Sequence, residues 1–318
     1  MLNVLSLFDG ISCAQVSLNN IGLKINKYYA SEIDKHAISI TQKNFPNTIQ
    51  LGNVQEINEE TLKNIEKIDI IFAGFPCQDI SLAGKRKGLE GSRSGLFFEF
   101  YRIYNYLKNN NNKDILFLVE NVGGIKKEDL LEINTLLKTE SIFLDSALFS
   151  AQRRKRHYWT NIPIIKELPN NKSYLKTILE NKIVGNEYNI DDKLLYTYQN
   201  LKDGQYWKDL PDCNPEKQKI IELRKKHKNP GGQTGFWKVY DKNLKAPTLT
   251  AQGLKQKMTR FVLIDNFGIY RYPTPLECER LQTLPENYTA CISDNNRYKA
   301  IGNGWNVKTI EWILKNKF

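Results

Sequence analysis

The 318-residue sequence predicts an α/β protein: a doubly wound, mostly parallel sheet with a smaller irregular lobe. Three observations predict this architecture. Short β-rich runs alternate with helical patterns over the first half of the chain. After about residue 163 the texture changes to sequence rich in Lys, Asn, Gly and Tyr, and regular patterns return near residue 267. We therefore expect a discontinuous main domain, 1–163 and 267–318, around a lobe at 164–266.

The elements of the main domain are predicted in chain order. Helix-like spacing is clearest at Leu96–Leu107, where apolar residues recur on one face. Thr274, followed by Pro275 and Glu277, predicts a capping box and a helix that runs through Leu284. A last helix is expected at Val307–Lys315. Strands are predicted at Asn3–Phe8, Lys27–Ser31, Ile68–Phe72, Ile115–Val119 and Ile142–Leu148.

Composition restricts the class of partner. The formal net charge of +11 and the isoelectric point near 9.2 favour a polyanionic partner over an acidic metabolite. The five cysteines are scattered and form no CxxC pair, which argues against a zinc site or a disulfide framework and suits a reducing cytoplasm. No apolar run is long enough for a bilayer. We expect a soluble cytoplasmic protein without metal or membrane contact.

The first predicted strand ends in a tight turn, Phe8–Ser12, that enters a helix. Gly10 lets the backbone approach a ligand, and Phe8 suits the face of a purine. Glu32 closes the second strand, where an acid can accept both hydroxyls of a ribose. An ordinary β–α turn beside a surface acid fits the same residues, so this turn alone does not establish a nucleoside site. No GxGxxG is present, which disfavours a dinucleotide.

A cysteine follows the predicted strand Ile68–Phe72 in the run Gly74-Phe75-Pro76-Cys77-Gln78. This run places Cys77 just beyond the carboxyl end of a parallel strand, where open α/β sheets bind ligands. Pro76 stiffens the turn, and Gly74 permits an unusual backbone angle. Because a lone structural cysteine is normally buried and inert, it is this position on a sharp turn that favours a reactive thiolate.

Charged residues follow two later strands. If the strands that precede Gly10, Cys77 and Glu120 are neighbours, these three residues converge on one edge of the sheet. In a strand over 152–156, Arg154 and Arg156 would share one side. Facing the crevice, the two arginines could bind a base oxygen and a phosphate. Taken separately, Glu120 also fits an exposed acid and the arginines a solvated basic face.

Together these motifs resemble the DNA (cytosine-5) methyltransferase family, of bacterial or phage type, in the order that the family shows. The resemblance covers nearly the whole chain except 164–265. It extends to the branch that contains the animal de novo enzymes at 7–11, 87–89, 96–102 and Gly304-Trp305. The motifs are Phe8-x-Gly10, Phe75-Pro76-Cys77-Gln78, Glu120-Asn121-Val122, Gln152-x-Arg154-x-Arg156, Pro275-x-Glu277-Cys278-x-Arg280-Leu281-Gln282 and Gly302-Asn303.

The resemblance implies the Rossmann-like fold of class I S-adenosylmethionine-dependent methyltransferases and methylation of carbon 5 of a flipped-out cytosine within a short sequence of double-stranded DNA. Cys77 would be the nucleophile, assisted by Glu120, Arg154 and Arg156. The expected cofactor-binding residues are Phe8, Gly10, Ile11, Glu32, Ile33, Asn53, Val54, Pro76, Leu96, Asn303 and Trp305. The expected DNA contacts are Ser81, Lys85, Arg93, Gln152, Gly232, Gln233, Thr248 and Thr250.

One departure and several alternatives accompany the resemblance. Asn53 stands where the family usually has Asp against the adenine amine. A monomer on DNA is expected, with a cognate restriction endonuclease acting separately. The alternatives are a tRNA cytosine-5 methyltransferase and a catalytically inactive DNA-binding homologue. Adjacent prolines, typical of exocyclic-amine methyltransferases, are absent from the sequence, and a Cys–His hydrolase would need a histidine such as His157 near Cys77.

Overall fold

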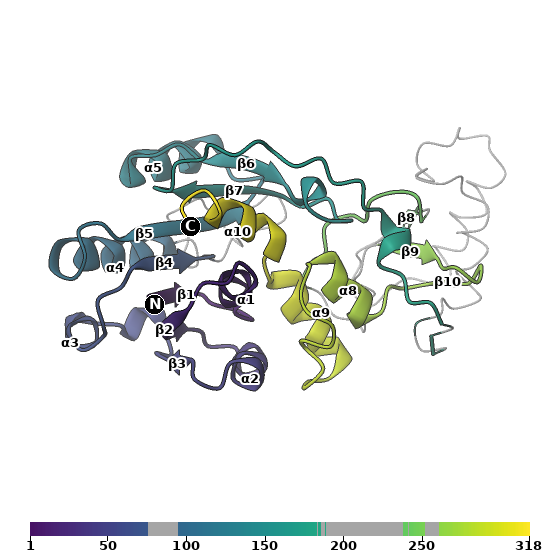
Figure 1. Cartoon of the computed structure of the whole chain (residues 1–318), viewed down its shortest axis with the longest axis horizontal. Coiled ribbons are helices and arrows are strands. Elements are labelled where there is room, and N and C mark those ends of the chain that lie inside the picture. The colour runs from purple at the N-terminus through teal and green to yellow at the C-terminus, as the bar shows by residue number, and fades with distance from the viewer. Residues whose placement is uncertain (76–94, 183, 186–187, 189–237, 241, 252–260) are drawn as a thin grey trace, which may run out of the picture.

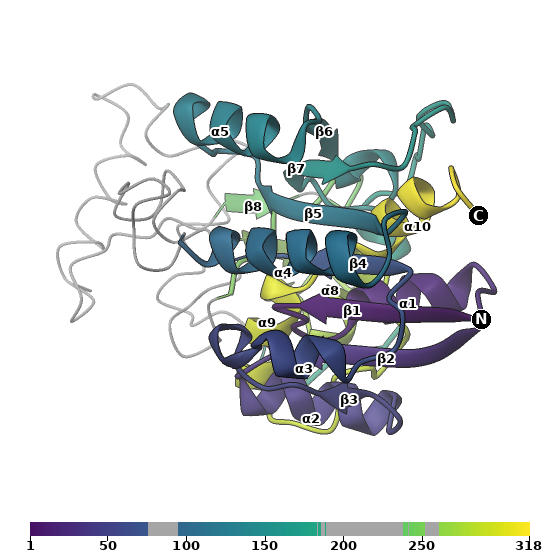
Figure 2. The same ribbon diagram turned by 90° about the vertical axis from the view of Figure 1, so that its left-hand side faces the viewer.

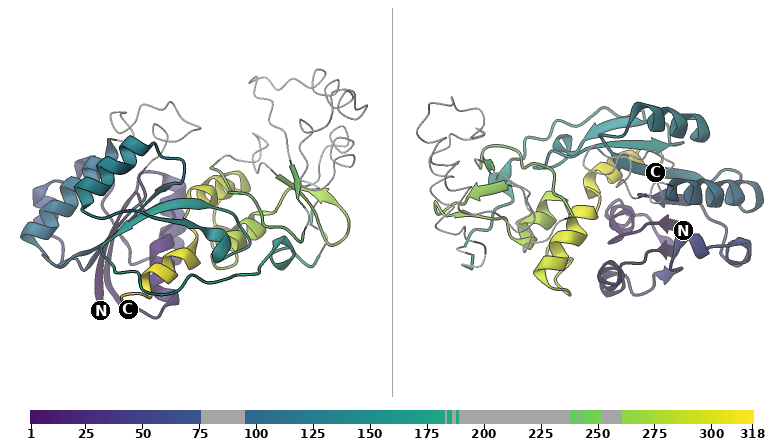
Figure 3. Two further views of the ribbon diagram at one scale, coloured as in Figure 1. Left: turned by 90° about the horizontal axis from the view of Figure 1, so that it is seen from above. Right: turned by 180° about the vertical axis from the view of Figure 1, so that it is seen from behind.

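The computed structural model describes residues 1–75, 95–182, 184–185, 188, 238–240, 242–251 and 261–318. Figure 1 shows a larger α/β body and, at its far end, a small sheet. The two chain ends lie close together on the larger body, as the views in Figures 2 and 3 agree. Among the described residues, no helix is long and apolar enough to cross a membrane.

The larger body contains a seven-stranded mixed sheet, which confirms the predicted doubly wound, mostly parallel architecture. The first five strands of the sheet order pair in parallel, and β7 pairs antiparallel with both of its neighbours, β5 and β6. The sheet order is β3 (Ile49–Gln50), β2 (Ile25–Ser31), β1 (Leu2–Leu7), β4 (Ile70–Ala73), β5 (Leu116–Val122), β7 (Lys155–Thr160) and β6 (Ile142–Asp145). The strands before Gly10, Cys77 and Glu120 are therefore neighbours, as the convergence of these residues requires.

Alternation of apolar side chains along the central strands covers both faces of the sheet. In β4, Ile71 faces the core formed with α3 (Glu59–Lys63), α4 (Leu96–Asn110) and α5 (Lys127–Leu137). Its neighbour Phe72 faces the core formed with α1 (Cys13–Asn20) and α10 (Val307–Leu314). A third core joins α2 (Lys35–Asn44) to α8 (Pro275–Leu281) and α9 (Asp294–Asn303). The carboxyl ends of β1, β4 and β5 thus meet at the edge of a sheet whose two faces are both covered by buried cores.

Several predicted bounds were wrong, for physical reasons that the structure shows. The strand predicted at Ile142–Leu148 ends at Asp145, whose side chain caps a short 3-10 helix, η3 (Ser146–Leu148). The strand predicted to end at Val119 continues to Val122, because antiparallel pairing with β7 extends it past the end of β4. The capping box at Thr274 is confirmed, but α8 ends at Leu281, ahead of Thr283, which has a φ of 58°.

The small sheet has the order β10 (Tyr270–Arg271), β9 (Phe261–Ile264) and β8 (Lys238–Tyr240). It extends past the predicted lobe boundary at residue 266. Described segments inside the predicted lobe, including η4 (Leu175–Thr177), place Leu175 and Leu249 in the third core together with Cys278. The predicted division into two domains stays a prediction, and these described parts of the lobe share a core with α8.

Candidate active site

The turn between β1 and α1 has a rare backbone conformation. Phe8, Gly10 and Ser12 have φ angles of 56°, 59° and 54°, a region that non-glycine residues seldom adopt. The Asp9 carboxylate links the turn to β2 and to the start of α1: the Tyr28 hydroxyl donates to Asp9 Oδ1 at 2.8 Å, and the Ser12 hydroxyl donates to Oδ2. Burial raises the pKa of Asp9 to about 6. Strained backbone of this kind is characteristic of ligand sites, and a Cβ at Gly10 would meet no atom within 4 Å.

Glu32 is held rigidly beside this turn. Its Oε2 accepts a hydrogen bond from the Gly10 N–H at 2.8 Å. Its Oε1 accepts from the N–H groups of Ile33 and Asp34 at 2.7 and 2.8 Å. Because a carboxylate has about four acceptor positions, Glu32 can accept at least one further hydroxyl. Asn53 Oδ1 accepts from the Gln55 N–H at 3.1 Å and retains a second lone pair for a ligand amine.

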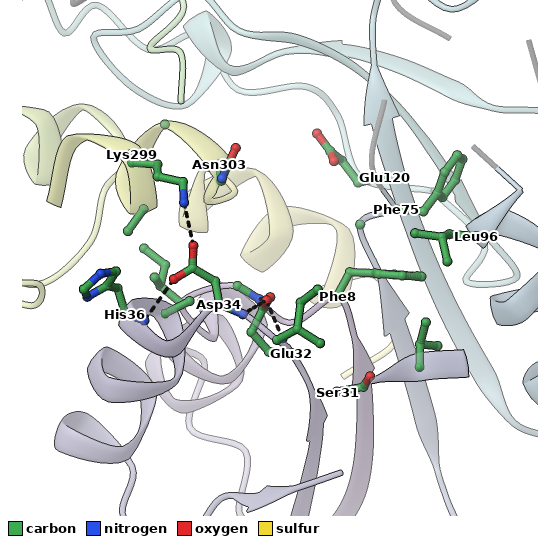
Figure 4. A pocket seen from close by; sticks show the side chains of 18 of the residues that line it. Phe8, Ser31, Glu32, Asp34, His36, Phe75, Leu96, Glu120, Lys299 and Asn303 are labelled. Carbon is green, nitrogen blue, oxygen red and sulfur yellow. Dashed lines mark hydrogen bonds and ion pairs between the residues drawn. The ribbon is translucent and has the colours of Figure 1, made fainter. Parts of the chain in front are cut away.

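These residues line a pocket of about 410 Å³ that opens outside the carboxyl ends of the strands. Its apolar wall includes Phe8, Val54, Phe75 and Leu96, and Figure 4 shows Phe75 and Leu96 on the side across from Glu32. At its rim, Lys299 of α9 donates to Asp34 Oδ2 at 2.8 Å. This contact joins two elements that lie on either side of the pocket.

Glu120 presents a second carboxylate to the same pocket and is 7% exposed. Its Oε1 lies 2.7 Å from Arg156 Nε, and its Oε2 accepts from the Trp305 indole N–H at 3.1 Å. Next to it on β5, Asn121 donates to the Phe75 carbonyl at 3.2 Å. β5 thereby fixes both the buried acid and the backbone that leads toward position 77.

Arg154 lines the pocket but directs its donors to the protein backbone. It is 3% exposed, and its guanidinium donates to the carbonyls of Leu249, Gly302 and Gly304 at 3.2, 3.3 and 2.9 Å. Burial, and then the nearby Arg156, lower the pKa of Arg154 to about 10. This geometry ties the segment after Ala246 to the end of α9.

Comparison with known proteins identifies the family. The sequence model described as C-5 cytosine-specific DNA methylase matches residues 2–318. The chain belongs to this family. This DNA methylase is 32% identical to the Type II methyltransferase M1.ScrFI of Lactococcus lactis subsp. cremoris, over 98% of this chain and 77% of the relative. It is 28% identical to the Type II methyltransferase M.HpaII of Haemophilus parainfluenzae, over 96% of this chain and 86% of that protein.

Solved structures share the fold of this DNA methylase. The Entamoeba histolytica methyltransferase EhMeth superposes with a TM-score of 0.73 at 20% identity, over 99% of this chain and 97% of that chain. A Spodoptera frugiperda DNMT2 mutant gives a TM-score of 0.67 at 20% identity, over 99% of each chain. At this level of identity the likeness concerns the fold alone. Membership of the family makes the protein a DNA (cytosine-5-)-methyltransferase.

Most of the residues that the sequence predicted for the active site of this methylase gather in one pocket. Trp305 is not among the lining residues, and its indole N–H donates to Glu120. Seven of the predicted residues lie outside the described part of the chain: Pro76, Cys77, Ser81, Lys85, Arg93, Gly232 and Gln233. The pocket lining includes Phe8, Gly10, Ile11, Glu32, Ile33, Asn53, Val54, Leu96, Glu120, Arg154, Arg156 and Asn303.

Three predicted DNA contacts lie in the described segments. Gln152 is fully buried, donates to Gln282 and accepts from the Leu249 N–H, so it supports the framework rather than a DNA surface. Thr248 donates its hydroxyl to the Arg153 carbonyl at 2.7 Å. Thr250 is half-buried, and its carbonyl packs against α9 at Gly302. The roles of the two threonines toward DNA stay predictions.

Sequence reasoning missed two features of the pocket, the contact of Asp34 with Lys299 and the close packing at Gly74. Asp34 caps α2 by accepting from the His36 N–H, a helix-start signal that could have drawn attention to it. Its partner Lys299 lies 265 residues away and carries no local signal. Gly74 permits an unusual backbone angle, but its φ is not in the left-handed region; a Cβ there would instead lie 2.9 Å from Trp305 Nε1. Gly74 is needed for close packing.

Proposed function

We propose that this enzyme transfers a methyl group from S-adenosylmethionine to carbon 5 of a cytosine flipped out of duplex DNA, within a short specific sequence. A covalent adduct with Cys77 would carry the reaction. One observation supports the proposal most strongly: a nucleoside-type cradle at Gly10 and Glu32 shares a pocket with the buried pair Glu120–Arg156.

The pocket fits the cofactor in size and chemistry. A volume of about 410 Å³ lies in the usual range for small-molecule sites. The apolar wall suits a purine ring, Glu32 suits ribose hydroxyls, and Asn53 suits the adenine amine. S-adenosylmethionine, when bound, supplies an electrophilic methyl group on a sulfonium. The chain's residues supply the adenosine contacts and exclude water from the apolar side.

The remaining chemistry belongs to the base. Carbon 5 of cytosine is a poor nucleophile, so the Cys77 thiolate would attack carbon 6 and push the ring's double-bond electrons toward carbon 5. Glu120 would hold ring N3 and share a proton with it as charge develops, with Arg156 steadying the carboxylate. After methyl transfer, loss of the carbon 5 proton re-forms the ring double bond and breaks the bond to sulfur. We propose water as the acceptor of that proton.

DNA binding is proposed from charge and from segments outside the described residues. The net charge of +11 suits a phosphate backbone. Flipping the base costs a few kcal/mol of stacking and pairing. The Gly- and Lys-rich sequence at 78–94 has the composition of a lid that closes over the flipped base, and the 164–266 lobe is proposed to read the major groove. Four expectations stay predictions: that the protein acts as a monomer on DNA, that a restriction endonuclease acts separately, that the protein is cytoplasmic, and that its sequence is similar to the branch containing the animal de novo enzymes.

Bisulfite sequencing of DNA from cells expressing the protein tests the proposal. Methylated cytosines confined to one short motif, and absent with Cys77→Ser, are the expected result. Unmodified DNA beside methylated tRNA would favour the tRNA methyltransferase, and no modification of either nucleic acid would favour the inactive homologue.

A further inference from the structure

We propose that Trp305 is a positioning residue for Glu120: its indole N–H fixes one carboxylate oxygen so that the other faces the target base. The proposal rests on the function proposed above, since it concerns how the acid of that reaction is oriented. The cofactor contact expected of Trp305 stays a prediction; Trp305 is not among the residues that line the pocket, and its indole N–H donates to Glu120.

The two oxygens of Glu120 are treated differently by their neighbours. Trp305 Nε1 donates to Oε2 at 3.1 Å. Arg156 Nε lies 2.7 Å from Oε1 but without the alignment of a hydrogen bond. Oε1 therefore forms an ion pair with Arg156 but receives no aligned hydrogen bond from the described part of the chain. Because a carboxylate oxygen in an ion pair still has an acceptor position for an aligned donor, this oxygen is the one that we assign to the incoming base.

The indole is itself held in place from two sides. The Phe72 ring meets it edge-on, with the ring centroids 6.3 Å apart and an interplanar angle of 63°. The Gly74 backbone lies so close that a Cβ there would be 2.9 Å from the indole nitrogen. Trp305 thus bridges Gly74, which follows β4 and lies three residues before Cys77, and the acid on β5. It sets the orientation of the carboxylate relative to the strand that leads to the nucleophile.

An indole suits this task for chemical reasons. Its N–H is a donor only, so it cannot compete with Glu120 for a proton. The ring is rigid and does not ionise, so its contact with Oε2 is the same at every working pH. Without it, the carboxylate can rotate about its last torsion, which is broad, and present its oxygens to the base in unproductive geometries.

The test is Trp305→Phe, which removes the N–H and keeps an aromatic ring. Trp312→Phe is the matched control. Trp312 lies on α10 and also donates its indole N–H, in this case to the Glu167 carbonyl at 3.1 Å. We expect Trp305→Phe to slow single-turnover methyl transfer about ten- to one hundred-fold, the effect of one hydrogen bond to a charged group. Cofactor and DNA dissociation constants and the unfolding midpoint should stay near wild type, and Trp312→Phe should retain the wild-type rate.

A double-mutant cycle separates positioning from a merely structural role. In a Glu120→Ala background, Trp305→Phe should have no further effect, because the residue it orients is gone. The Trp305 indole resonance, assigned by its loss in Trp305→Phe, should also shift on Glu120→Ala while that of Trp312 does not. An equal loss in both backgrounds, or an unchanged rate for Trp305→Phe, overturns the proposal alone. Inactive wild-type protein overturns it together with the proposed function.

Discussion

Replacing Arg154 by Met should lower the stability of the protein strongly and its rate of methyl transfer only slightly. The sequence motif placed Arg154 and Arg156 together in catalysis, but their guanidinium groups bind different partners. Arg154 donates to three backbone carbonyls in the interior, and Arg156 pairs with the carboxylate of Glu120. Met keeps much of the buried volume of Arg154 and removes all of its donors. Arg156→Lys is the companion variant, since it keeps a charge beside Glu120 and loses the planar fork.

The size of the effect follows from these contacts. Hydrogen bonds from a charged donor contribute about 1.5–3 kcal/mol each, and Arg154→Met removes three. The change also relieves an unfavourable burial of charge: the pKa of Arg154 falls from 12.5 to about 10, equivalent to about 3 kcal/mol. The net loss in free energy of unfolding is therefore about 1.5–6 kcal/mol.

Urea unfolding and single-turnover methyl transfer measure the two effects separately. Arg154→Met should unfold at a lower urea concentration and, at temperatures where it is folded, transfer methyl groups at a rate within a few-fold of wild type. Arg156→Lys should unfold near the wild-type midpoint and lose about ten- to one hundred-fold in rate. If Arg154→Met has wild-type stability but a much lower rate of methyl transfer, this reasoning is refuted and Arg154 instead contacts the substrate.

Three further predictions concern residues that support the site. Arg271→Met should lose about 3–5 kcal/mol in urea unfolding, because it leaves two buried carboxylates without their partner; an unchanged midpoint contradicts this. The pKa of Asp9 is raised from 3.8 to about 6, so the folded state binds more protons than the unfolded state between these values and stability falls as pH rises from about 4 to 6. Asp9→Asn should remove this slope, on the order of 2 kcal/mol, from calorimetric melting profiles, and a parallel profile would argue against it. Gly302→Ala should lower the free energy of unfolding by about 1–3 kcal/mol, since its Cβ would lie 2.3 Å from the Thr250 carbonyl oxygen. An unchanged melting temperature would contradict this, because it would show that the backbone moves aside without a loss of stability.

The parts that sequence could predict depend on local signals. The capping box at Thr274 was predicted because all of its donors and acceptors lie within four residues. The convergence of Gly10 with Glu120 was predicted because strand order and direction place the carboxyl ends together. The end of β5 was misplaced, since its length depends on a partner strand that comes more than thirty residues later.

The parts that sequence could not predict depend on distant partners. Trp305 and Glu120 are 185 residues apart, and nothing in either local sequence indicates that an indole N–H will meet a carboxylate. The same holds for Arg154, whose acceptors are backbone carbonyls 95 to 150 residues away. Motif matching groups residues by position in the chain, whereas their roles depend on which atoms face them after folding.

Trapping the covalent adduct tests the central claim most directly. The substrate is a DNA duplex that carries the target motif found by bisulfite sequencing, with 5-fluorocytosine in place of the target cytosine. Because fluorine replaces the hydrogen on carbon 5, this base has no proton to lose there after attack and methyl transfer. With S-adenosylmethionine, the account predicts a protein–DNA complex that resists denaturing electrophoresis, with the linkage mapped to Cys77 and lost in Cys77→Ser. Methylation of ordinary cytosine in this motif without any trapped complex, or a linkage to another residue, would contradict it.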